Sequence, residues 1–122
     1  TGNAKVLKEH NKDILICAVE PASSAVLSGE PAGTHKLQGI GAGFIPSVMD
    51  MSLVNRILKI EDEEAYRYAV GIAKTQGILL GISGGAALSG ALKIAKELGT
   101  GKKVLFIAPD NGERYLSTGL YE

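Results

Sequence analysis

Apolar residues in the first half of this chain recur first with a helical period and then as a run of strand length. The helical stripe starts with the first residues, which predicts a helix at the beginning of the sequence. The continuous apolar run at residues 14–19 suits a strand buried on both faces, as in a parallel sheet. Pro21 favours a short helix over residues 21–28, and clustered Gly and Pro predict an irregular loop over residues 29–47.

The middle of the chain predicts a strand followed by a helix. Residues 56–60 form a short run of strand length. The acidic run 61–64 comes next, and negative charge is favourable in the first turn of a helix. Ala65 and Ala69 lie on the helix face that is expected to be buried, and Gly77 is expected to end the helix.

Two further strands and a long helix complete the pattern. Residues 78–82 predict a buried strand, and a helix with an apolar face follows Ser83 and ends at Gly99. Residues 103–108 predict the last strand. Strands that alternate with helices imply an α/β layer structure with a largely parallel sheet. A length of 122 residues fits one domain at most.

Composition and charge argue against several classes of function. Thirteen basic and thirteen acidic side chains give a formal net charge of zero, which argues against a nucleic-acid footprint or a polybasic membrane surface. No apolar stretch reaches transmembrane length. The single Cys17 cannot form an internal disulfide, so we expect it to be a small buried hydrophobe in a cytoplasmic protein.

The string Gly-Ile-Ser-Gly-Gly at residues 81–85 lies between a predicted strand and a predicted helix. Ligands of open α/β sheets bind beyond the carboxyl ends of strands, so this position favours a binding site. A helix cap at Ser83 and an anion site at the helix N-terminus both fit the pattern. The string also matches the nucleophile elbow of hydrolases, but their histidine follows the serine, whereas His10 and His35 precede Ser83.

A second glycine cluster, Gln-Gly-Ile-Gly-Ala-Gly, occupies residues 38–43. Phe44 stands where a dinucleotide fingerprint requires glycine, so the cluster is not that motif. Close approach of the main chain to a flat ligand and a plain irregular loop both explain the repeated glycine. His35 and Lys36 just upstream form a small basic spot, for which solvated loop charge is the simplest interpretation. The acidic run 61–64 is interpreted as a solvated helix start, and we expect no metal site.

These strings together resemble the C-terminal part of the cysteine synthase family, also called O-acetylserine sulfhydrylase. Their order and spacing match over nearly the whole chain, and the longer strings are far more specific than a lone glycine motif. Two departures are modest: Gly84 stands where many members have a second serine, and residues 29–34 are less typical. The matching strings lie at residues 19–29, 35–46, 81–87 and 109–118.

The resemblance implies the fold of the tryptophan synthase β-subunit type, with two α/β domains around pyridoxal 5'-phosphate. For this chain it implies part of a three-layer α/β domain with a mainly parallel sheet. It implies a β-replacement in which O-acetyl-L-serine and sulfide give L-cysteine and acetate. Ser83 matches the serine whose hydroxyl meets the pyridine nitrogen of the cofactor. Gly39, Ile40 and Gly41 match the loop that passes beside cofactor and substrate.

The resemblance further implies that residues 1–122 are the C-terminal portion of the large domain of a homodimeric enzyme. The Schiff-base lysine, substrate loop and phosphate cup of the family match nothing in this chain and are expected upstream. We therefore expect no catalytic residue here and an inactive fragment. His35 and Lys36 are expected at the site mouth, facing substrate or the C-terminal tail of serine acetyltransferase. A cystathionine β-synthase-like enzyme and a non-catalytic cofactor- or peptide-binding module are the alternatives.

Overall fold

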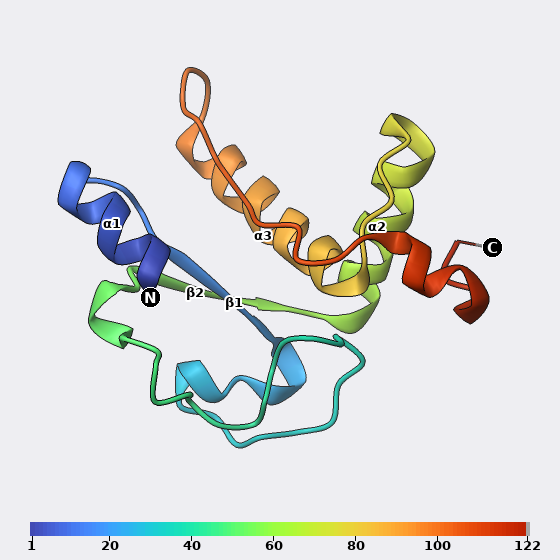
Figure 1. Ribbon diagram of the computed structural model, residues 1–122, viewed down its shortest axis with the longest axis horizontal. Helices are drawn as coiled ribbons and strands as arrows, with labels where there is room; N and C mark the ends of the chain where they lie inside the picture. The colour runs from blue at the N-terminus through green and yellow to red at the C-terminus, as the bar shows by residue number, and fades with distance from the viewer. Residues whose placement is uncertain (122) are drawn as a thin grey trace.

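The chain folds into three α-helices, two parallel β-strands and several short 3-10 turns, as the computed structural model shows for residues 1–121 (Figure 1). The two strands cross the middle of the molecule. Helices α2 and α3 pack against each other above the strands in this view, and the long loop after β1 lies below them. The elements are α1 (Gly2–His10), β1 (Cys17–Pro21), β2 (Arg56–Ile60), α2 (Asp62–Gln76) and α3 (Ile82–Leu98).

Strands β1 and β2 form a parallel pair that aligns residues 17–21 with residues 56–60. The predicted α/β arrangement with parallel pairing is confirmed. The first strand begins three residues later than the predicted run 14–19, because Ile16 bonds the residue before β2 instead of continuing the ladder. The Ile16 N–H donates to Asn55 Oδ1 at 2.9 Å, and the Ile16 carbonyl accepts from the Asn55 N–H at 2.8 Å.

The short helix predicted after β1 exists as two 3-10 turns, η1 (Ala22–Ser24) and η2 (Val26–Ser28). The second turn, η2, is held by the buried Glu20 near the end of the strand. Its carboxylate accepts from the Leu27 N–H at 2.7 Å and from the Ser28 hydroxyl at 2.5 Å. A buried carboxylate with several donors is satisfied and fixes the local backbone. The loop that follows is irregular, as predicted.

Helix α2 begins at its acidic run and ends at Gly77, whose φ of +69° is left-handed, so both predicted boundaries are confirmed. Glu64 in the first turn joins this helix to α3. It accepts from Ser89 Oγ at 2.6 Å and from Lys93 Nζ at 2.9 Å. Burial by itself would raise the pKa of Glu64, but these two bonds outweigh burial and lower the pKa below its ordinary value.

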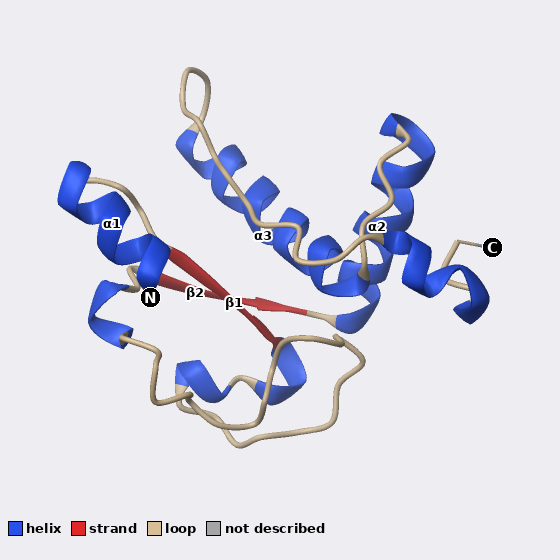
Figure 2. Cartoon of the chain, viewed as in Figure 1, coloured by secondary structure: helices blue, strands red, loops and turns tan. Residues whose placement is uncertain are grey.

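The two strands predicted at residues 78–82 and 103–108 do not form, and Figure 2 shows both segments as loops apart from the start of α3. Their only strand-like pairing in the described structure is an antiparallel bridge between Leu80 and Asn111. A strand needs a partner ladder for its backbone groups. No other strand of the described chain lies alongside residues 103–108, and the side chain of Leu105 is 83% exposed. Those two predictions are therefore wrong for this chain.

The hydrophobic core lies where β2, α2, α3 and the C-terminal 3-10 helix η4 (Gly112–Thr118) meet. A residue of the irregular loop also belongs to it, because Leu37 is fully buried there. Among residues 1–121, no helix combines the length and the apolarity that a membrane span requires. The buried members of the core are Leu37, Ile60, Ala65, Ile82, Ala86, Tyr115 and Leu120.

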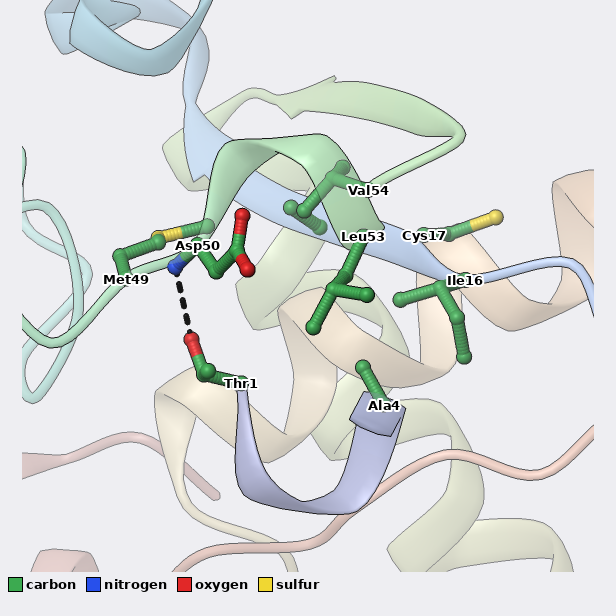
Figure 3. Close-up of a pocket in the computed structure, with 9 residues that line it drawn as sticks. Thr1, Ala4, Ile16, Cys17, Met49, Asp50, Leu53 and Val54 are labelled. Carbon is green, nitrogen blue, oxygen red and sulfur yellow. Dashed lines mark hydrogen bonds between the residues drawn. The ribbon is translucent and has the colours of Figure 1, made fainter. Parts of the chain in front are cut away.

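A pocket of about 190 Å³ opens between α1, β1 and the 3-10 helix η3 (Met51–Leu53) (Figure 3). The Asp50 N–H donates to Thr1 Oγ1 across it at 2.8 Å. Cys17 lines this pocket and is half-buried rather than fully buried. Burial raises the pKa of the Cys17 thiol, so the thiol stays protonated and is a poor nucleophile. None of the residues predicted for cofactor binding lines the pocket.

Candidate functional site

The fold brings the two glycine clusters of the sequence together at the start of α3. A Cβ added to Gly39 would lie 3.7 Å from Ser83 Oγ, so the main chain at Gly39 faces that hydroxyl directly. Gly39 has a φ of +91°, which other residues rarely adopt. Ser83 itself is only 5% exposed. The two segments are more than forty positions apart in the sequence, and the fold brings them together.

His35 braces the loop that carries Gly39. Its Nε2 lies 2.8 Å from the carbonyl oxygen of Gly41, and its Nδ1 lies 3.2 Å from the N–H of Leu37. This pair of contacts fits the neutral tautomer in which Nε2–H donates and Nδ1 accepts. A Cβ at Gly41 would come within 2.6 Å of His35 Nε2, so a larger residue at that position would displace the ring.

Lys36 differs from its neighbour because its side chain is exposed. The Lys36 N–H donates to Asp62 Oδ2 at 2.8 Å, which ties the loop to the first turn of α2. The two residues of the predicted basic spot, His35 and Lys36, therefore have different surroundings. The imidazole of His35 is committed to the loop backbone, and the ammonium of Lys36 lies at the surface.

The hydroxyl of Ser83 meets a carboxylate that the sequence patterns did not single out. Ser83 Oγ donates to Asp110 Oδ1 at 3.3 Å, and Tyr115 OH donates to Asp110 Oδ2 at 2.5 Å. The hydrogen bond to Asp110, followed by burial, raises the pKa of Tyr115 to about 12. Asp110 and Tyr115 both lie in the string 109–118 that carries the family resemblance, and that string was the available signal.

Ser83 does not cap α3. The helix begins at Ile82, its N-cap is Gly81, and no side chain makes a capping hydrogen bond there. Ser83 is thus the second residue of the helix, and its hydroxyl is directed to Asp110 instead of to a first-turn amide. Of the two interpretations that the sequence left open at this position, the helix cap is wrong.

The arrangement places one buried hydroxyl beside a stretch of main chain that carries no side chain. With no Cβ on Gly39, the main chain of the loop comes close to the buried hydroxyl of Ser83. A single hydroxyl at the edge of such a face can hydrogen-bond a ring nitrogen. His35 bonds the loop backbone through both ring nitrogens, and Asp110 accepts from two hydroxyls. His35 therefore holds the loop, and Asp110 orients the hydroxyl of Ser83. The site is built for binding and positioning.

Comparison with known proteins identifies the family of this chain. Residues 1–110 match the family model described as "Pyridoxal-phosphate dependent enzyme". The chain therefore belongs to the family of pyridoxal-phosphate dependent enzymes. Within that family it is 50% identical over 121 residues to a cysteine synthase of Staphylococcus aureus (strain Mu50), a match that covers 99% of this chain and 39% of that protein.

Solved structures agree in fold. The cysteine synthase of Entamoeba histolytica aligns with a TM-score of 0.95 and 47% identity, covering 98% of this chain and 36% of that one. The O-acetylserine dependent cystathionine β-synthase of Helicobacter pylori aligns with a TM-score of 0.88 and 42% identity. This match covers 99% of this chain and 39% of that one. The chain thus spans about two fifths of the length of the relatives it matches.

Proposed function

We propose that this chain is the C-terminal portion of the large domain of a pyridoxal-phosphate dependent cysteine synthase. The full-length enzyme would convert O-acetyl-L-serine and sulfide into L-cysteine and acetate. The observation that supports this most directly is the position of Gly39, where an added Cβ would lie 3.7 Å from the buried hydroxyl of Ser83. It occurs within a chain that is 50% identical to a cysteine synthase over 121 residues.

Within that enzyme the residues of this chain hold the cofactor, which when bound supplies the electron sink for β-replacement. Ser83 meets the ring nitrogen through its hydroxyl. The loop of Gly39, Ile40 and Gly41 lies beside the ring and the substrate. Its shape is fixed by His35 on one side and by the buried Leu37 on the other. The lysine that bonds the cofactor and the main-chain cup for its phosphate are assigned to sequence outside these 122 residues.

The 122-residue chain by itself is expected to form no cysteine, because covalent attachment and phosphate binding supply most of the hold on the cofactor. The purified chain would be mixed with pyridoxal phosphate, O-acetylserine and sulfide, and cysteine would be measured against free cofactor. The full-length protein is the positive control and should form cysteine. Cysteine above the free-cofactor background from the short chain would contradict this assignment of roles.

A cystathionine β-synthase-like activity is the second candidate, because the Helicobacter pylori relative is 42% identical over 99% of this chain. The same full-length protein separates the two. We expect faster turnover of O-acetylserine with sulfide than with homocysteine. Faster formation of cystathionine would favour the second candidate. A full-length protein that binds the cofactor but turns over neither pair would be the non-catalytic binding module.

We also infer a cytoplasmic homodimer whose site mouth receives the C-terminal tail of serine acetyltransferase, with the exposed Lys36 facing the peptide carboxylate. Replacing Lys36 with alanine in the full-length enzyme should weaken binding of the tail peptide by up to about 5-fold, since exposed charge pairs contribute about 1 kcal/mol or less. The loss should shrink at high salt because the charges are solvated. Calorimetric titration measures both effects.

Lys74→Ala is the matched control, because Lys74 is also an exposed lysine but lies in the last turn of α2. It should leave peptide affinity unchanged. His35→Ala is a separate variant, since His35 braces the loop backbone and its loss would act through loop shape. Equal affinities for the wild type and the Lys36 variant would leave Lys36 as an ordinary solvated charge.

A further inference from the structure

The glycine loop beside Ser83 has little conformational preference of its own. Gly39, Gly41 and Gly43 have positive φ angles of +91°, +69° and +79°. Glycine reaches this left-handed region without steric cost, but it samples many other conformations equally well. Local preference alone therefore does not hold the loop on one path, and contacts with the rest of the fold must do so.

The loop lies at the carboxyl edge of the parallel pair. Strands β1 and β2 end side by side, because Pro21 is aligned with Ile60. A Cβ on Gly41 would collide with the Pro21 ring, so the loop main chain lies against the end of β1. Helix α2 begins at Asp62, directly after the end of β2 and its N-cap residue. The end of β1 thus contacts the loop, and the end of β2 places Asp62 next to it.

Asp62 joins the loop to α2. Its Oδ2 accepts a hydrogen bond from the N–H of Lys36 at 2.8 Å. Among residues 1–121 this is the one hydrogen bond between residues 35–41 and a helix or strand, because both bonds of His35 stay within the loop. In that same part of the chain the other carboxylate oxygen, Oδ1, is buried and accepts no hydrogen bond. The described hydrogen bonding of the Asp62 side chain is therefore directed to the loop alone.

Two anchors hold the loop immediately before Gly39. The side chain of Leu37 is fully buried in the core, and the N–H of Lys36 is bonded to Asp62. We propose that Asp62 is a positioning residue that holds residues 39–41 where they contact the amino-acid substrate beside the cofactor. This inference rests on the proposed function and adds to it a residue of α2 that acts through the loop.

Replacing Asp62 with alanine in the full-length holoenzyme should raise the KM for O-acetylserine about 5-fold, the effect of losing one ordinary hydrogen bond. The kcat should stay within about 2-fold of the wild type, because the loop binds substrate and carries no reacting group. Asp62→Asn keeps an acceptor for the Lys36 N–H and should restore most of the affinity. Steady-state kinetics at a fixed sulfide concentration measure all three effects.

Asp62→Ser is the second variant if the alanine protein does not fold. Serine suits the start of a helix, but its hydroxyl is too short to reach the Lys36 N–H, so its KM should rise as in Asp62→Ala. Glu63→Ala is the matched control, because Glu63 is an exposed acid of the same first turn. It removes an equally placed negative charge and should leave the KM unchanged.

Three kinetic outcomes would overturn the proposal. In the first, Asp62→Ala and Asp62→Ser lose stability but keep the wild-type KM, so that Asp62 is only structural. In the second, Asp62→Asn is as impaired as Asp62→Ala, so that the charge matters and the hydrogen bond does not. In the third, Glu63→Ala raises the KM as much as Asp62→Ala does, so that any acid of the first turn has the same effect.

A second measurement needs neither cofactor nor activity. In the cofactor-free full-length protein, the Lys36 amide should exchange its hydrogen about 5-fold faster in Asp62→Ala than in the wild type, and at the wild-type rate in Glu63→Ala. Hydrogen exchange followed by mass spectrometry measures these rates. Equal exchange in all three proteins would show that Asp62 does not hold the loop and would overturn the proposal. A full-length protein that binds no cofactor would overturn the proposed function instead, so the two failures are distinguishable.

Discussion

Replacing Gly85 with alanine in the full-length enzyme should lower its free energy of unfolding by about 2 kcal/mol, as overpacking at a tight contact does. A Cβ there would collide with the carbonyl oxygen of Ala65 and lie 2.9 Å from Ala69 Cβ and 3.0 Å from Ala69 N. These atoms belong to the backbone and first side-chain atom of α2, which cannot rotate away. The two helices would have to separate next to Ser83.

Gly71→Ala is the matched control, because Gly71 is also a helical glycine but has nothing within 4 Å of a new Cβ. It should be neutral or stabilise the protein by up to about 1 kcal/mol, the difference in helix propensity. Denaturant unfolding of both variants measures the contrast. If Gly85→Ala were as stable as Gly71→Ala, the close approach of α2 and α3 at this point would be incorrect.

Replacing Ser83 with alanine should weaken cofactor retention by about 10-fold in the full-length enzyme, the effect of losing one hydrogen bond of about 1 to 1.5 kcal/mol. It should also change the absorption spectrum of the bound cofactor and slow the elimination of acetate. Ser83→Asp should be worse for folding at neutral pH, because it places a second carboxylate beside Asp110. Spectra, dialysis against buffer and single-turnover rates measure these effects.

Ser89→Ala is the control for Ser83→Ala. Both serines are buried in α3, but Ser89 donates to Glu64 and joins two helices, whereas Ser83 faces the glycine loop. The control should lose stability of about 1 kcal/mol and leave the cofactor spectrum unchanged. Should Ser83→Ala behave in the same way, with loss of stability only, the proposed contact between Ser83 and the cofactor would be wrong.

The elements whose pattern is local could be predicted from the sequence. Strand 56–60 and helix α2 have their predicted boundaries, because an acidic first turn and a glycine with positive φ are signals contained within the element. The strand at 14–19 was predicted with the wrong start, since Ile16 bonds Asn55 rather than continuing the ladder. Its apolar residues carried no information about that competing partner.

The segments at 78–82 and 103–108 could not be decided from their own residues. Both are apolar and of strand length, yet a strand forms only where a neighbour completes its hydrogen bonds. The described chain offers them one bridge, at Leu80, and the side chains of Leu105 and Ile107 stay exposed. Whether these residues form strands depends on pairing with a neighbouring strand, and the local pattern of apolar residues does not indicate that pairing.

The sequence by itself predicted which residues form the candidate site: the glycine loop around Gly39 and the serine at the start of α3. It did so through composition, the placement of glycine and proline residues, and a family pattern that spans nearly the whole chain. Only the tertiary structure decided that His35 braces the loop, that Ser83 is not a cap, and that the Ser83 hydroxyl donates a hydrogen bond to Asp110. Ser83 and Asp110 are 27 positions apart. Hydrogen bonds between such distant residues depend on how the elements pack, which the pattern of either segment alone does not contain.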